Sequence, residues 1–270
     1  MNSIAQGGHM LSGGVVAKLE RRLSRHMARR PGRLKLRSAA VSFTFDDVPQ
    51  SACLRGRQLM ESGAGAATYY VCGGYTGTVR EVRMHTLADL RSLHAAGHEI
   101  ACHGFGHHDM QALGPRLSAL DMDRNLQYLQ DQGLADGSAI NFAYPFGCVS
   151  PALKREAARR YMSARGVTGG QHGADVDQDL IGAVPLYDAQ LSRQAVTELI
   201  EANAAQGGWL VFFTHGVLEA PGAYDCSPSL LQHALSVTKA TGCEILSVRA
   251  ALGAGTLHTG APPLKQAFAA

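Results

Sequence analysis

From Ser38 onward, short runs rich in β-branched and aromatic residues alternate with longer stretches of helical periodicity, and this alternation limits the fold most strongly. It is typical of parallel strands joined by crossover helices. Seven or eight strand–helix units in one chain of 270 residues favour a closed α/β barrel over two domains. In such barrels the functional residues lie at the carboxyl ends of the strands, and this rule tests any proposed site.

The expected elements follow this alternation, and no linker or internal repeat interrupts them. We therefore expect one domain over residues 38–270, preceded by a basic N-terminal extension over residues 1–37. We expect strands at residues 39–45, 66–71, 99–102, 140–143, 161–164, 181–185, 210–214 and 244–247. We expect helices at residues 54–62, 87–96, 116–132, 151–160, 193–206 and 228–241.

The composition is that of an ordinary globular protein, with 46% hydrophobic and 17% charged residues. This balance excludes disordered and collagen-like chains. The longest uncharged apolar stretch, residues 207–218, is interrupted by Gly, Thr and His, so we expect no transmembrane helix. Six scattered cysteines without a C-x-x-C pair indicate reduced thiols that serve mainly in packing.

The N-terminus shows no secretory signal, because residues 1–10 are polar and Gly-rich and the following segment is strongly basic. We therefore expect a cytoplasmic protein. Gly7-Gly8-His9-Met10 resembles the remnant of an expression tag, which makes residues 1–9 foreign and Met10 the native start. In that case a native signal peptide that has been removed is an open alternative.

Basic residues are concentrated between Lys18 and Arg37, where nine Lys or Arg accompany Glu20 alone in a chain of formal net charge +3. Apolar residues recur every four positions through this run, so a helix here is amphipathic, and we expect Pro31-Gly32 to end it. The favoured interpretation is a solvated helix packed on the domain through its apolar stripe. The alternative is a contact with an anionic membrane surface or with nucleic acid. The stripe consists of Val15, Leu19, Leu23 and Met27.

Carboxylates and histidines follow two of the expected strands. Asp46 and Asp47 end the first strand, and such adjacent acids stay ionised most easily beside a cation, although a surface turn needs none. His103 and His107 follow the third strand, and the glycines between them disfavour a helix, so a bent loop can direct both rings at one ion. One carboxylate with two imidazoles forms a site with open positions, suited to Zn²⁺ or another divalent metal.

A second pair of histidines has the same spacing. His94 and His98 lie at the end of an expected helix and in the turn before a strand. They do not follow a strand end, so we interpret them as surface or packing residues.

Four motifs at strand ends resemble the signature motifs of the polysaccharide deacetylase family, the NodB-homology domain of carbohydrate esterase family 4. The resemblance extends over residues 39–252 and implies a deformed (β/α)7 barrel that uses a divalent metal to remove N-acetyl groups from amino sugars. The motifs are Thr44-Phe45-Asp46-Asp47, His103-x-x-x-His107, Ala143-Tyr144-Pro145-Phe146-Gly147 and Phe212-Phe213-Thr214-His215.

The resemblance implies catalytic roles for five residues. Asp46 is the general base and His215 the general acid. Asp47, His103 and His107 are the ligands of one divalent metal, with Zn²⁺ favoured and Co²⁺, Mn²⁺ or Ni²⁺ as alternatives. These residue types suit the chemistry, because a metal polarises the amide carbonyl and lowers the pKa of bound water towards about 7, while expulsion of the amine requires a proton donor.

The resemblance also implies substrate contacts. The Phe146 N–H helps to hold the oxyanion, a contact worth roughly 3–4 kcal/mol when well aimed. Tyr144 and Pro145 shape the groove. Val211 and Phe213 line the pocket that receives the acetyl methyl group.

The chain departs from the family pattern at three places. The Ser or Thr that normally follows the first ligand histidine is Gly104, so the hydrogen bond that braces this loop must come from elsewhere. The Arg normally found two residues before the proline of the third motif is Ala143, which leaves Asp46 without an identified partner. The fourth motif, with its Asp and Trp, has no clear match. The candidates for orienting His215 are Asp175, Asp177 and Asp188.

The function we expect is deacetylation of N-acetylhexosamine units in an exopolysaccharide or adhesin-type glycan or its lipid-linked precursor. The basic N-terminal segment then makes a peripheral contact at the inner face of the membrane. Two alternatives are a metal amidohydrolase acting on a non-sugar amide and a glycan-binding pseudoenzyme. We expect no nucleic-acid partner, because the basic run lacks interleaved aromatics and a known module. The sequence does not determine the oligomeric state.

Overall fold

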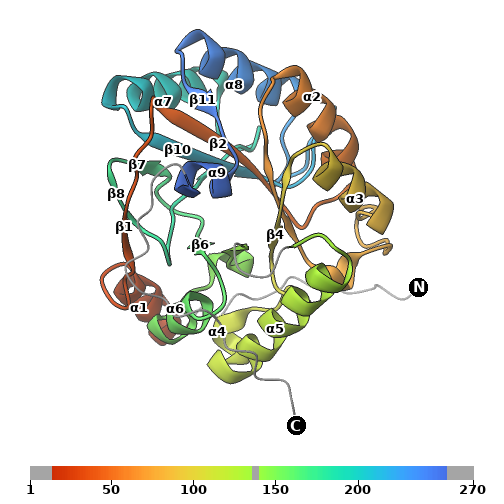
Figure 1. Cartoon of the computed structure of the whole chain (residues 1–270), viewed down its shortest axis with the longest axis vertical. Coiled ribbons are helices and arrows are strands. Elements are labelled where there is room, and N and C mark those ends of the chain that lie inside the picture. The colour runs from red at the N-terminus through yellow and green to blue at the C-terminus, as the bar shows by residue number, and fades with distance from the viewer. Residues whose placement is uncertain (1–13, 136–139, 254–270) are drawn as a thin grey trace, which may run out of the picture.

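The computed structural model describes residues 14–135 and 140–253, and its centre is a curled, mainly parallel sheet (Figure 1). The order of its strands is β6-β5-β4-β3-β2-β10-β7, with β11 beside β2 and β9 beside β10. Only β7 runs antiparallel to its neighbour. The strands are β2 (Ala40–Asp46), β3 (Thr68–Val71), β4 (Glu99–Cys102), β5 (Asn141–Ala143), β6 (Ser163–Arg165), β7 (Gln171–His172), β9 (Val184–Pro185), β10 (Trp209–Thr214) and β11 (Glu244–Ile245).

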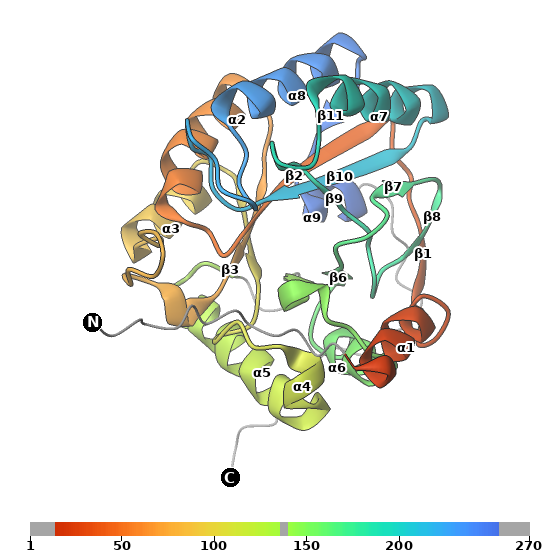
Figure 2. The same ribbon diagram turned by 180° about the vertical axis from the view of Figure 1, so that it is seen from behind.

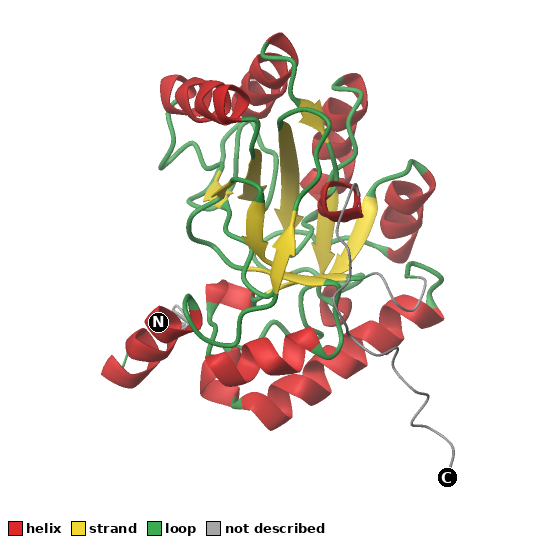
Figure 3. Cartoon of the chain, turned by 60° about the vertical axis from the view of Figure 1, so that its left-hand side comes forward, coloured by secondary structure: helices red, strands yellow, loops and turns green. Residues whose placement is uncertain are grey.

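Most helices cover the outside of this sheet, whereas α9 lies against its inner face and packs with Ala40 and Trp209 (Figures 2 and 3). Several begin at a side-chain cap, as in the capping box of Thr86 and Asp89 and the serine caps of Ser150, Ser192 and Ser227. The helices are α2 (Arg57–Ser62), α3 (Leu87–Ala95), α4 (Met110–Leu113), α5 (Pro115–Asp131), α6 (Pro151–Ala158), α7 (Arg193–Gln206), α8 (Pro228–Ala240) and α9 (Val248–Gly253). A π-helical turn (Ala52–Gly56) precedes α2, and 3-10 turns cover Gly73–Tyr75 and Pro145–Gly147.

The expected α/β class and deformed barrel are confirmed. The segment after residue 180 runs from β6 to β10, because Arg165 forms a bridge with Ile181 and Phe212 pairs with Val184. Only two residues of this segment form a regular strand, so the expected strand at 181–185 is shortened to β9. The other seven expected strands and all six expected helices of this region are present, with ends displaced by a few residues.

The alternation of side chains along β2 decides which residues face the barrel interior. Val41, Phe43 and Phe45 pack in the large core between sheet and helices. Ala40 instead packs in a separate core with Trp209, and Ser42 accepts a hydrogen bond from the Trp209 indole. Asp46 has the same parity as these two residues, so its carboxylate points into the barrel at the carboxyl end of the strand.

The N-terminal region contributes α1 (Val15–Ser24) and β1 (Pro31–Arg33). The expectation that Pro31-Gly32 ends the helix is wrong, because α1 ends at Ser24 and these residues begin β1. The chain then leaves the helical conformation at Ala28, which has a φ of 50°. The buried ammonium of Lys154 on α6 caps this end by donating to the carbonyls of Ser24 and Met27, at 2.9 and 3.2 Å. β1 pairs with β8 (Asp175–Asp177) in a small antiparallel sheet that the sequence did not predict.

The apolar stripe of α1 does not pack on the domain, which corrects the favoured interpretation of this segment. The residues of α1 that are buried are Ala17 and Ser24. Val15, Leu19, Leu23 and Met27 are 84%, 54%, 39% and 48% exposed. Within the described residues, no helix is both long and apolar enough to span a bilayer.

Candidate metal centre and active site

The carboxyl end of β2 turns sharply and separates Asp46 from Asp47. Asp47 and Val48 have φ values of 58° and 56°, in the left-handed region that non-glycine residues avoid, above all β-branched ones. The Val48 N–H closes this turn on the carbonyl of Asp46, at 2.5 Å. His107 and Phe146 also have positive φ, so most of the strained non-glycine residues in the described chain lie at this end of the barrel. Such clustering of strain is common at functional sites.

Asp47, His103 and His107 converge as expected from the sequence. Their ligand atoms all lie within 4.8 Å of one another. The Asp47 Oδ1 atom is 3.3 Å from Nε2 of His107 and 3.8 Å from Nε2 of His103. The His103 Nδ1 atom lies 2.8 Å from the carbonyl oxygen of Ala143, which can only accept, so Nδ1 carries the hydrogen and Nε2 keeps its lone pair.

This donor set fits one divalent metal ion. A carboxylate oxygen and two imidazole nitrogens are ligands of Zn²⁺ and related metals, and three protein ligands leave positions for water and substrate. Histidine must be neutral to bind a metal. Burial, with the neighbouring His107, lowers the pKa of His103 to about 4, so this ring is neutral at pH 7. His103 and His107 could therefore hold such an ion together with Asp47.

Asp121 on α5 braces the loop between the two histidines. Its carboxylate accepts hydrogen bonds from the Phe105 and Gly106 N–H groups, at 2.8 and 3.0 Å. Gly104 has a φ of 73°, and a Cβ atom there would lie 2.7 Å from the Asp121 carboxylate. Glycine at 104 therefore lets Asp121 approach and supply the bracing that the family obtains from Ser or Thr.

We predict that Asp121→Ala weakens zinc binding by about 10- to 100-fold, because it removes both acceptors that fix the loop carrying His107. Stability should fall by about 1–3 kcal/mol, since two N–H groups lose their partners. Zinc titration and urea unfolding measure these effects. Asp131→Ala at the exposed end of the same helix is the control, and equal zinc affinities for the two variants contradict this role.

Asp46 has a partner that the sequence did not reveal. The Arg165 guanidinium donates to both carboxylate oxygens of Asp46 through one nitrogen, at 2.5 Å. Arg165 is 1% exposed, and its guanidinium carbon lies 4.9 Å from the centre of the Tyr70 ring and 5.0 Å from that of Phe213. Burial alone raises the pKa of a carboxyl, but Arg165, helped by His103 and His215, holds the pKa of Asp46 below its ordinary value. Asp46 is therefore an ionised carboxylate next to Asp47 in the chain and close to His103.

His215 follows β10 and is oriented by a backbone carbonyl. Its Nδ1 lies 3.1 Å from the Tyr224 oxygen, so Nδ1 carries the hydrogen and Nε2 is the nitrogen that can exchange a proton with the site. Aromatic rings surround it, with the centres of Tyr187 and Tyr224 at 6.0 and 5.8 Å from that of the imidazole. Tyr187 follows β9, beside β10, and also packs edge-on against Phe213.

None of the three aspartates proposed to orient His215 makes a hydrogen bond to it in the structure. Asp175 is an exposed residue of β8. Asp177 pairs with the buried Lys154 ammonium at 2.6 Å. Asp188 binds the N–H and hydroxyl of Ser227 at the start of α8, at 2.6 and 2.8 Å. Asp177 and Asp188 are therefore engaged elsewhere, and the Tyr224 carbonyl takes the Nδ1 hydrogen bond of His215 instead.

The residues expected to contact the substrate range from the metal centre to the buried core. The Phe146 ring packs 4.4 Å from that of His107, and Phe213 lies over Arg165. Val211 is fully buried two residues deeper in β10. Tyr144 is 1% exposed and donates its hydroxyl to the Asp179 carbonyl, so it supports the third-motif loop from inside. Pro145 is buried beside it.

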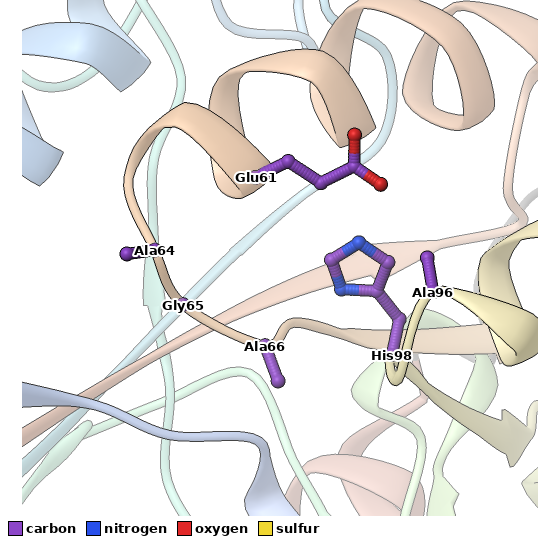
Figure 4. Close-up of a pocket in the computed structure, with 6 residues that line it drawn as sticks. All are labelled: Glu61, Ala64, Gly65, Ala66, Ala96 and His98. Atoms are coloured by element: carbon purple, nitrogen blue, oxygen red, sulfur yellow. The ribbon is translucent and has the colours of Figure 1, made fainter.

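The pocket shown in Figure 4 lies at the opposite end of the barrel, where β3 and β4 begin. His98 lines it, and its Nδ1 accepts a hydrogen bond from the Ala67 N–H at 3.1 Å. His94 is exposed. The interpretation of both histidines as packing or surface residues agrees with this arrangement.

Residues 34–177 match the family model for polysaccharide deacetylase. The chain belongs to the polysaccharide deacetylase family. No curated protein matches it. Among solved structures, the family 4 carbohydrate esterase from Streptomyces lividans is 18% identical over 77% of this chain and 91% of its own, with a TM-score of 0.53. The Xyl-CE4 domain of a xylanase from the hindgut metagenome of Trinervitermes trinervoides is 17% identical over 78% and 88%, with a TM-score of 0.55.

A pseudoenzyme of the same carbohydrate esterase family from Bacillus anthracis is also similar in fold, at 13% identity over 82% of this chain and 68% of its own, with a TM-score of 0.56. Fold alone therefore does not establish catalysis for a polysaccharide deacetylase. In the present chain, Asp121 braces the loop at Gly104, and Arg165 pairs with Asp46 where the third motif has Ala143. The Tyr224 carbonyl binds His215 in place of a fourth-motif aspartate.

Proposed function

We propose that the protein is a metal-dependent deacetylase that hydrolyses N-acetyl groups of N-acetylhexosamine units. The observation that carries this proposal is the buried Asp46 carboxylate, held ionised by Arg165 next to Asp47, His103 and His107. A metal site that served only structure would not need a second, separately held acid.

The residues have complementary tasks in such a reaction. When bound by Asp47, His103 and His107, a divalent metal supplies Lewis acidity that activates water and polarises the amide carbonyl. Asp46 accepts the proton as water attacks, and Arg165 keeps the carboxylate fixed and ionised. The Phe146 N–H donates to the developing oxyanion. Protonated His215 gives a proton to the departing amine, because amide ions are poor leaving groups.

The proposed substrate is an exopolysaccharide or adhesin-type glycan, or its lipid-linked precursor at the inner face of the membrane. Tyr224 is 64% exposed beside His215, so its ring is open to a substrate next to the proposed proton donor. Large aromatic faces with polar edges suit a sugar ring that carries both apolar and hydroxyl surfaces. A non-sugar amide is the alternative substrate, since the metal and the acid–base pair do not recognise the leaving amine.

Acetate release tests the proposal. Metal-free protein is reconstituted with Zn²⁺ or Co²⁺ and assayed on N-acetylglucosamine oligomers, on lipid-linked N-acetylhexosamines and on simple acetamides. Turnover of the amino sugars is the expected result. Turnover of simple acetamides alone identifies the non-sugar amidohydrolase, and oligomer binding without acetate release identifies a pseudoenzyme.

A further inference from the structure

We propose that α1 is a membrane-docking element that seats the protein on anionic phospholipid. Four apolar residues of this helix point away from the domain and are hereafter called the α1 apolar face. They are Val15, Val16, Leu19 and Leu23, and they are 84%, 72%, 54% and 39% exposed. Single exposed leucines are ordinary, but four apolar residues within three turns of one helix form a contiguous patch.

Specific contacts hold α1 in this orientation. The Gln111 amide on α4 donates to the Ala17 carbonyl at 3.2 Å and to the Glu20 carboxylate at 3.0 Å, and it accepts from Arg21 at 2.7 Å. At the other end of the helix the buried Lys154 ammonium binds two backbone carbonyls. The outward orientation of the α1 apolar face is therefore a property of the folded protein.

The charges beside this face favour an anionic partner. At about 100° per residue, Lys18, Arg22 and Arg25 lie along one edge of the α1 apolar face. All three are exposed. The buried residues Ala17 and Ser24 lie beyond its other edge. Glu20 is the single acid of α1, and it is bound to Gln111. Basic residues near an anionic membrane contribute about 1 kcal/mol each, and the apolar face adds its burial among the acyl chains.

Other partners fit this surface less well. A second copy of the chain would bring two basic helices together, and their like charges would repel. Nucleic acid would neutralise the basic residues but leave the α1 apolar face in water. A lipid surface satisfies both features at once, because its phosphate groups and acyl chains lie at adjacent depths.

The location of α1 connects this surface to the active site. Gln111, which holds the helix, follows the ligand His107 by four residues. α1, α4 and α5 lie at the same end of the molecule in both views (Figures 1 and 2). Docking through α1 would therefore place the catalytic end of the barrel near substrates carried by the membrane. This consequence rests on the proposed function, whereas the docking surface itself does not.

Vesicle co-sedimentation of the full chain tests the proposal, with phosphatidylcholine vesicles that contain or lack phosphatidylglycerol. We expect binding only with the anionic lipid. Leu19→Ser with Leu23→Ser, and separately Arg22→Gln with Arg25→Gln, should each weaken binding by at least about tenfold. Leu54→Ser and Arg91→Gln change equally exposed residue types elsewhere and should bind like the unaltered protein.

Two further measurements make the outcomes distinct. All variants should keep the melting temperature and the acetate release from soluble oligomers, so that a failure of docking and a failure of the catalytic proposal are separate results. Absence of binding to anionic vesicles overturns the docking proposal, as does binding that the four α1 substitutions leave unchanged. A dimer in light scattering that Leu19→Ser with Leu23→Ser dissociates also overturns it, in favour of self-association.

Discussion

Replacing Asp46 by Asn should lower kcat/KM for acetate release by about 10²- to 10⁴-fold, which is the usual contribution of a general base. The amide keeps the size of the carboxylate but cannot accept the proton. Asp46 is not among the three residues whose ligand atoms converge, so metal content should be unchanged. Acetate release and metal analysis on the same preparation measure both effects.

The Asp46→Asn result has two informative controls. Asp131→Asn removes an exposed carboxylate far along α5 and should leave kcat/KM unchanged. Unfolding in urea shows whether a loss of activity reflects a loss of fold, because the substitution leaves the Arg165 charge buried without its partner. A folded Asp46→Asn protein that retains metal and a tenth or more of the activity excludes Asp46 as the base.

Arg165→Met should have the second large effect, on both stability and the pH profile. Removing one partner of a buried ion pair typically costs about 3–5 kcal/mol. Without the guanidinium, the pKa of Asp46 rises. Asp46 can act as a base only when ionised, so activity falls as the pH drops through its pKa. Because this pKa is higher in Arg165→Met, the acidic limb of kcat/KM should move to higher pH. Arg165→Lys retains a positive charge and should lie between Arg165→Met and the unaltered protein.

A double-mutant cycle measures how strongly Asp46 and Arg165 stabilise each other in the folded protein. Each single change leaves one lone charge in the barrel, whereas Asp46→Asn combined with Arg165→Met leaves none. The double variant should therefore be less destabilised than the two single effects added together. Arg160→Met, which breaks a partly exposed ion pair at the end of α6, is the matched control. An unmoved acidic limb in Arg165→Met would falsify the role of Arg165 as the residue that positions the base.

The sequence predicted the convergence of Asp47, His103 and His107 better than it predicted the groups that support them. Asp47, His103 and His107 follow strand ends at fixed spacings, so a motif and a barrel rule sufficed to bring them together. Arg165 was missed because its contact depends on strand register. It lies directly opposite Ala143 in the β5–β6 pair, so the neighbouring strand supplies the charge that the third motif lacks. A charged residue immediately after the buried run Ser163-Ala164 was the available signal.

Orientation of surface helices is another property that the sequence did not settle. The four-residue period of Val15, Leu19 and Leu23 correctly predicted an amphipathic helix. It did not show which face packs on the domain, because polar contacts to Gln111 and Lys154 decide that, and both residues lie far along the chain. The role of Asp121 was also missed, because the sequence shows it only as one of several acids on an expected helix. Its contact with the loop after Gly104 depends on the tertiary fold.

The most direct test of the account is a zinc titration of metal-free protein, comparing His107→Ala with His108→Ala. His107 lies among the three converging ligand atoms, whereas the adjacent His108 has a 55% exposed side chain, 3.8 Å from Asp121. We expect one ion per chain in the unaltered protein and in His108→Ala, and a loss of affinity of at least about 100-fold in His107→Ala. Equal affinity in all three proteins, or no zinc binding in any, contradicts this expectation.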